Sequence, residues 1–187
     1  MRNSLILLLT ATIWGMAFVS QSKGMDYMHP FTFNGVRSLI GAAGILVYIL
    51  ISRKIAGDKA AKLDWKLNVR AGLLCGIFLT IASTLQQFGI KYTSVGKAGF
   101  ITTLYIIFVP MFGIFLKKKV APVVWAAASM AAVGMYLLCM TESLRLGAGD
   151  IMVFLCAIAF AIQIMTVDHY AARIDGAVVS CIQFTVC

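Results

Sequence analysis

The chain has 187 residues, of which 61% are hydrophobic and 12% are charged, and its formal net charge at pH 7 is +9. A soluble domain is typically about 25% charged, so this composition excludes an ordinary soluble domain and leaves no place to house a soluble enzyme. The positive charge does not indicate a nucleic-acid partner, because the basic residues gather in the joints between long apolar runs.

Six apolar runs follow one another along the chain. A helix rising about 1.5 Å per residue needs roughly 20 residues to cross about 30 Å of hydrocarbon, and each run is long enough or nearly so. Helices satisfy their own backbone groups in lipid, and the runs lack the alternation of barrel strands. An all-α polytopic membrane protein with six transmembrane helices is therefore predicted. The runs are Leu5–Ser22, Phe31–Ile51, Ala71–Ile90, Val95–Leu116, Pro122–Met140 and Ile151–Val167.

Basic residues are concentrated on one side of the predicted membrane. The joint from Ser52 to Arg70, which reads as an ordinary loop, carries six of them, and Lys117–Lys119, Arg2 and Arg173 fall on the same side. By the positive-inside rule, the protein is expected in the cell membrane, surrounded by lipid, with a cytoplasmic N-terminus. The six residues in the joint are Arg53, Lys54, Lys59, Lys62, Lys66 and Arg70.

The first two runs each carry one residue that lipid does not explain. Trp14 lies in the middle of its helix, away from the aromatic belts at the membrane surfaces, so it is either a packing anchor or a cavity wall. Arg37 lies about 9 Å inside the second run, where a guanidinium is costly. It either attracts anions at the mouth of a cavity or reaches back to the outer headgroups.

The third run carries both small residues and large amides. Gly72 and Gly76 have the spacing that lets helices approach closely, which favours tight packing over substrate contact. Gln86 and Gln87 need polar partners at that depth, either across a helix interface or in a wet cavity.

The fourth run is the strongest candidate for a binding helix. Phe100 and Thr103 fall close to one face with Tyr105 beside it, and Pro110 removes a backbone hydrogen bond and should kink the helix. Transporters often build their sites at interrupted helices, although the bend can also be merely structural. Gln163 in the sixth run is a weaker candidate of the same kind.

Asp150 follows Gly147-Ala148-Gly149, and Gly-x-Gly-Asp also occurs in intramembrane aspartyl proteases. Those enzymes need a second membrane-embedded aspartate, whereas the other aspartates here fall in joints or at helix ends. Capping of the sixth helix is therefore the favoured interpretation of Asp150. His29 and His169 lie at joints and the cysteines are not spaced as ligands, so neither a metal nor another cofactor is expected.

Two features concern the organisation of the chain. The segments Thr10–Gly15 and Cys156–Ala161 share a small polar residue followed four places later by an aromatic residue, and they begin on opposite sides of the membrane, as an inverted repeat requires. A seventh apolar stretch begins at Ala177 and reaches only Cys187, about half a span. The chain is therefore expected to be a fragment that breaks off within a helix.

Several short motifs together resemble the EamA-type permeases of the drug/metabolite transporter superfamily. They are Trp14-Gly15, Pro30 followed by Arg37, the start of the fourth helix at Tyr92–Ala98, Pro110 within that helix, and Gly149-Asp150. The resemblance implies ten helices in two inverted five-helix repeats around a central cavity, and secondary transport of small metabolites, often export. The family often has Trp-Ala where this chain has Phe160-Ala161.

On this basis residues 1–140 are expected to form the first repeat and residues 150–187 the truncated start of the second. The expected function is alternating-access transport of amino acids, other metabolites or drugs, not enzymatic catalysis. Two alternatives stay open: a nontransporting membrane component that pairs with a second copy or another chain supplying helices, and an intramembrane protease using Asp150. The candidate cavity residues are Trp14, Arg37, Gln86, Gln87, Phe100, Thr103, Tyr105 and Gln163.

Overall fold

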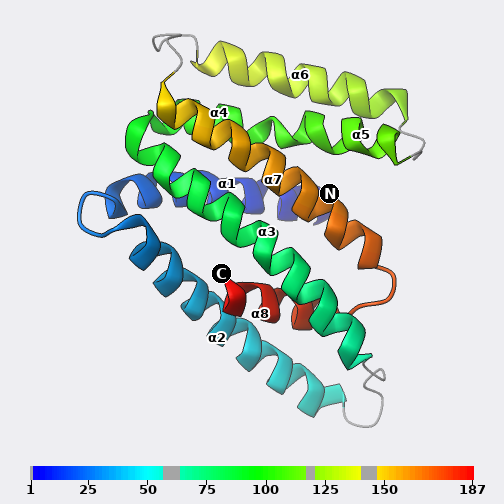
Figure 1. Ribbon diagram of the computed structural model, residues 1–187. Helices are drawn as coiled ribbons and strands as arrows, with labels where there is room; N and C mark the ends of the chain where they lie inside the picture. Colours follow the sequence, from blue (N-terminus) through cyan, green and yellow to red (C-terminus); the bar gives the residue numbers. More distant parts are fainter. Residues whose placement is uncertain (1, 57–63, 117–120, 140–146) are drawn as a thin grey trace.

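The described part of the chain is entirely helical apart from short turns. The computed structural model describes residues 2–56, 64–116, 121–139 and 147–187 (Figure 1). α4 and α5 are two parts of one helix that is interrupted at Leu104. The prediction of an all-α protein is thus confirmed. The helices are α1 (Arg2–Gly24), α2 (Pro30–Ala56), α3 (Trp65–Tyr92), α4 (Val95–Thr103), α5 (Tyr105–Phe115), α6 (Pro122–Cys139), α7 (Ala148–Tyr170) and α8 (Gly176–Val186).

Among the described residues, five helical stretches are long and apolar enough to cross a membrane, and the chain is a multi-pass membrane protein. α4 and α5 count together as one of these stretches. Within α6, the apolar stretch Pro122–Gly134 is shorter, as is α8. The five long stretches are Leu5–Gly24, Pro30–Ile55, Trp65–Tyr92, Val95–Phe115 and Ala148–Tyr170.

The helices extend beyond the apolar runs, so the prediction of a loop from Ser52 to Arg70 is wrong at both ends. α2 continues to Ala56, and α3 begins at Trp65, where Asp64 Oδ1 accepts a hydrogen bond from the Leu67 amide at 3.1 Å. The physical reason is that helical hydrogen bonds need no apolar side chains, and a capping carboxylate stabilises a helix start. Residues Lys59, Lys62, Lys117–Lys119 and Met140 lie outside the described part.

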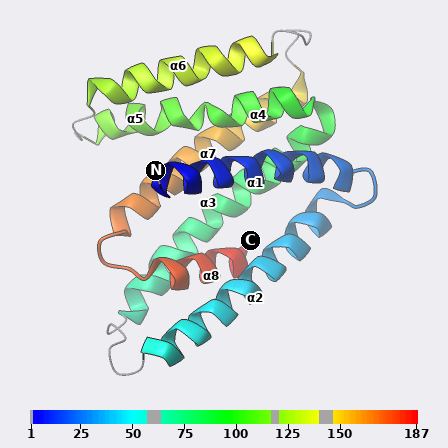
Figure 2. The same ribbon diagram turned by 180° about the vertical axis from the view of Figure 1, so that it is seen from behind.

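α3 and α7 pack along each other at the centre of the fold (Figure 1). Small side chains with no exposed surface lie in these two helices, and such residues allow close approach of helices. α8 packs against α2 and α3, α6 packs on α4 and α5, and α1 crosses the rear of the molecule (Figure 2). In α3 and α7 the fully buried small residues are Ala71, Cys75, Ala82, Cys156, Ala157 and Ala161.

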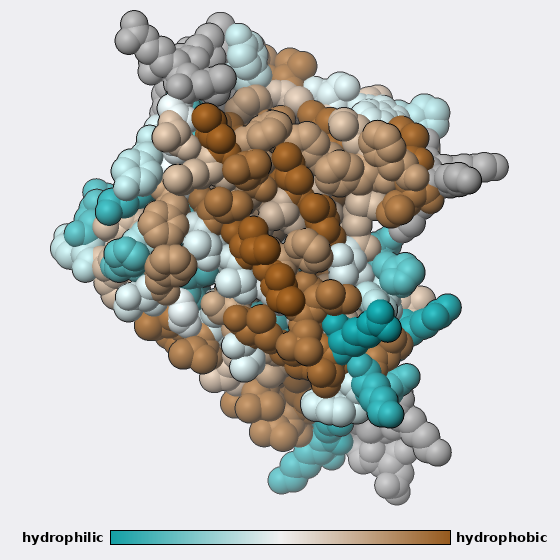
Figure 3. All heavy atoms as spheres, viewed as in Figure 1, coloured by the Kyte–Doolittle hydropathy of each residue, from teal (hydrophilic) through white to brown (hydrophobic). Residues whose placement is uncertain are grey.

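The outer surface of the helices is apolar. Leu7 on α1 and Ile40 on α2 each expose 69% of their surface. On the face seen in Figure 3, apolar residues cover most of the middle, and hydrophilic residues gather towards the left and right edges, where the helices begin and end. Exposed apolar area of this extent is typical of a surface that contacts lipid.

The glycines of α3 serve helix packing, as their spacing predicts. A Cβ atom on Gly72 would lie 2.7 Å from the Cβ of Ile182, and one on Gly76 would lie 2.9 Å from the Cβ of Val186. Both contacts are with α8. The interpretation of these two glycines as packing residues is confirmed.

Candidate functional site

Three helices are joined where α3 ends and α7 begins, a region called here the closed end. The carboxylate of Asp150 is 3% exposed and accepts hydrogen bonds from three donors. These are the Thr93 hydroxyl after α3, the Lys97 ammonium on α4 at 3.2 Å, and the Gly147 amide at 2.9 Å. The last bond covers a free amide at the start of α7, which confirms the capping interpretation.

The backbones of α3 and α7 nearly touch at the closed end. A Cβ atom on Gly149 would lie 2.8 Å from the carbonyl oxygen of Gly89, and one on Gly89 would lie 2.9 Å from that of Gly149. Real Cβ atoms essentially never come so close to a backbone atom. Glycine at both positions therefore lets the two helices meet without a gap.

Away from the closed end, α3, α5 and α7 separate around a cleft of about 590 Å³. The wall is largely apolar, with a hydroxyl from Thr166, an imidazole from His169 and a phenol from Tyr170. Most of the residues from α7 belong to its last turns, whereas the closed end is at its first turn. The lining residues are Leu74, Phe112, Phe115, Leu116, Ile162, Met165, Thr166, His169 and Tyr170.

The two predicted amides of α3 are buried and point to different neighbours. Gln86 Nε2 donates to Thr102 Oγ1 at 3.3 Å, which links α3 to α4. Gln87 has no exposed surface, and its Nε2 donates to the sulfur of Met25 at 3.5 Å. The Oε1 atom of Gln87 is buried and has no hydrogen-bond partner.

Gln21 on α1 is a buried amide that the sequence interpretation missed. It is 5% exposed, and its Oε1 atom also lacks a hydrogen-bond partner. The signal that could have found it is the one used for Gln87, a large amide within an apolar run. What the run could not show is that this side of α1 faces protein.

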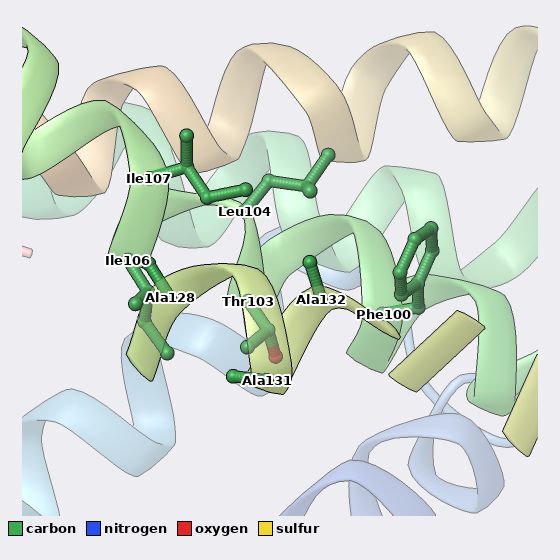
Figure 4. Close-up of a pocket in the computed structure, with 8 residues that line it drawn as sticks. All are labelled: Phe100, Thr103, Leu104, Ile106, Ile107, Ala128, Ala131 and Ala132. Carbon is green, nitrogen blue, oxygen red and sulfur yellow. The ribbon is translucent and has the colours of Figure 1, made fainter. Parts of the chain in front are cut away.

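Phe100 and Thr103 contribute to the contact between α4 and α6. They line a gap of about 10 Å³, which is no larger than about one water molecule (Figure 4). The hydroxyl of Thr103 donates to the carbonyl of Gly99 on its own helix at 2.7 Å. The other lining residues are Leu104, Ile106 and Ile107 beside Ala128, Ala131 and Ala132 of α6.

Tyr105 faces the central helix α7, and its ring centroid lies 6.4 Å from that of Phe160. The interruption of the helix lies beside it, at Leu104, whose amide bonds to the carbonyl of Ile101. Pro110 is inside α5 and leaves the carbonyl of Ile106 without its helical donor. The interruption at Leu104 therefore lies before the turn in which Pro110 removes a hydrogen bond.

The remaining candidates are Trp14, Arg37 and Gln163, and the last two bond to side chains other than Gln86 and Gln87. Trp14 is half exposed on α1. The Nη2 atom of Arg37 on α2 donates to Asn34 Oδ1 at 2.8 Å, and Asn34 in turn donates to Ser83 of α3 at 2.9 Å. Gln163 donates to Gln183 of α8 at 3.3 Å, beside a cavity of about 290 Å³ between α7 and α8.

No group of three or more His, Cys, Asp or Glu residues in the described ranges could hold a metal ion.

Comparison with known proteins identifies a family. Residues 1–140 match the EamA-like transporter family. A protein of Archaeoglobus fulgidus, described as an uncharacterized transporter, is 30% identical over 171 residues, which cover 88% of this chain and 48% of that protein. The chain thus spans about half the length of this relative. No solved structure matches the chain. From the match over residues 1–140, the chain belongs to the EamA-like transporter family.

Proposed function

We propose that this chain takes part in secondary transport of small metabolites across the cell membrane by alternating access. Residues 1–140 form the first five-helix repeat, in which α6 also crosses the membrane, and residues 150–187 begin an inverted second repeat. The substrate site lies among α1, α3, α4 and α7, near Gln86 and Gln87. Arg37 and Trp14 lie towards its edge.

The observation that carries the proposal is the unequal spacing of α3, α7 and the interrupted helix α4–α5 at their two ends. At one end Asp150, Thr93 and Lys97 join the helices, and at the other the helices enclose a cleft of about 590 Å³. A pathway closed at one end and open at the other is what alternating access requires of each of its states. The polar tie between α4 and α7 can break and re-form as the repeats move.

The experiment is a release assay in liposomes that contain the purified protein. The liposomes are loaded with a mixture of the twenty common amino acids, and mass spectrometry follows each compound in the outside solution. The protein is expected to release at least one of them faster than protein-free liposomes do, with a rate that saturates.

A pair of variants tests the cleft. Thr166→Trp places an indole in the cleft and should slow release at least tenfold, whereas Thr10→Trp places it on the exposed side of α1 and should leave release unchanged. Release equal to that of protein-free liposomes for every compound would contradict the proposal. Equal release by Thr166→Trp and the unmodified protein would contradict it as well.

A further inference from the structure

The contact between α1 and α3 holds two hydrogen-bond acceptors without donors. The amide of Met25 bonds to the carbonyl of Gln21 at 3.2 Å, so these residues lie one turn apart on the same side of α1. The side chain of Met25 reaches Gln87 of α3. Phe18, just before Gln21 on this side, packs on the cluster of Ile90, Ala98, Ile101 and Val153. Gln21 therefore also faces the α3 and α4 side of α1.

The chemistry of Met25 determines which atom of the Gln87 amide has no hydrogen-bond partner. A thioether sulfur can only accept a hydrogen bond, so the nitrogen of Gln87 makes this bond and the oxygen takes no part in it. Gln21 Oε1 is buried without a partner in the same way. The two buried atoms without a partner are therefore both hydrogen-bond acceptors, and each needs a donor.

Buried amide oxygens without donors are rare and unfavourable in folded proteins. Resting on the transport function proposed above, we propose that Gln21 and Gln87 bind an ammonium or amide N–H group of the substrate. An ammonium carries three N–H donors, and an amide N–H carries one, so either group can donate to such an oxygen. A carboxylate offers only acceptors and would leave them unpaired, so amines, amides and amino acids held by their nitrogen fit this contact.

The weak packing of α1 provides the route into this contact. In an apolar stretch of 18 residues within α1, only 6% of the residues are buried, compared with 44% in the corresponding stretch of α3. A helix with so few buried residues separates from its neighbours at lower cost than the central helices do. The contact can therefore open by movement of α1 while α3 and α7 stay together.

The test uses two probes that share an aromatic chain and differ in the head group, phenethylamine and 3-phenylpropanoate. The aromatic chain suits the apolar surroundings of Phe18. Binding to the detergent-purified protein is measured at pH 7 as the rise in melting temperature over a range of probe concentrations. Phenethylamine should raise the melting temperature at concentrations at least tenfold below those at which 3-phenylpropanoate does.

Gln21→Leu and Gln87→Leu distinguish binding from a structural role. Each should weaken phenethylamine binding at least tenfold, yet leave the melting temperature of the ligand-free protein unchanged or higher, because an unpaired buried oxygen is removed. Thr12→Val, on the exposed side of α1, is the control and should bind normally. Equal stabilisation by the two probes, or normal binding by both leucine variants, would overturn the inference.

The outcome is separable from that of the release assay. If release from liposomes is seen and slowed by Thr166→Trp, but the probes do not discriminate, the substrate class alone is wrong. If no release is seen, the transport proposal is wrong whatever the probes show.

Discussion

Lys97 Nζ lies 3.2 Å from Asp150 Oδ2 and so joins the first turn of α4 to the first turn of α7. Lys97 belongs to the part of the chain that matches the family over residues 1–140, and Asp150 follows that part. The ion pair therefore links the two proposed repeats. The backbone contact between Gly89 and Gly149 lies beside it.

The ion pair should show strong coupling between its partners. Lys97→Met leaves the buried carboxylate of Asp150 without its cation, and removal of one partner of a buried pair typically costs about 3 kcal/mol or more. In the double variant Lys97→Met with Asp150→Asn no unpaired charge remains, so the loss should be smaller. The measurement is the free energy of unfolding in mixed micelles with increasing denaturing detergent.

Thr93→Val is a milder change at the same carboxylate. It removes one hydrogen bond to a charged group and should cost about 1.5 to 3 kcal/mol.

If Lys97→Met and the double variant have the same free energy of unfolding, Asp150 does not depend on Lys97, and the ion pair does not hold the closed end.

The close approach of α3 and α7 should make Gly149 intolerant of a side chain. The new Cβ atom of Gly149→Ala would collide with the backbone of Gly89 and Tyr92, and overpacking typically costs about 1 to 3 kcal/mol. Gly44→Ala is the control, because a Cβ atom there meets nothing within 4 Å. It should be neutral or stabilise α2 by up to about 1 kcal/mol. Equal melting temperatures of the two variants would show that the helices do not meet at Gly149.

Asn68 should hold the start of α8 against α3. Its Oδ1 atom accepts from the Asp175 amide at 2.8 Å, and the residue is 1% exposed. Asn68→Leu removes this bond, at a cost of about 0.5 to 1.5 kcal/mol, because Asp175 is an exposed residue whose amide is not left buried without a partner. Hydrogen exchange should become roughly tenfold faster in peptides that contain Asp175.

A control for this exchange experiment is Thr185→Val, which removes only a bond within α8 on an exposed side chain. It should leave exchange at Asp175 as it is in the unmodified protein. Unchanged exchange in Asn68→Leu would mean that this hydrogen bond does not hold the start of α8 against α3.

The helices could be predicted because a membrane span needs a long apolar segment, and the length of each apolar run can be counted in the sequence. Which side of a helix meets which neighbour is set by tertiary packing, and a single apolar run does not record it. Gln21 was therefore not predicted as a buried residue. Nothing in the fourth apolar run predicted that Thr103 would line the same gap as Ala131 of α6. Asp150 was interpreted correctly as a cap, but its bonds to Thr93 and Lys97 depend on the crossing of α3 and α7.

The orientation that the positive-inside rule predicts can be tested with one cysteine on each side of the membrane, in a background without other cysteines. Tyr27 is 87% exposed in the turn between α1 and α2, and Ala171 is exposed just after α7, on the side of Arg53 and Lys54. The positive-inside rule places that second side in the cytoplasm. A membrane-impermeant maleimide should therefore label Tyr27→Cys in intact cells, and Ala171→Cys only after the cells are permeabilised. The reverse pattern would mean that the charge distribution does not set the orientation of this protein.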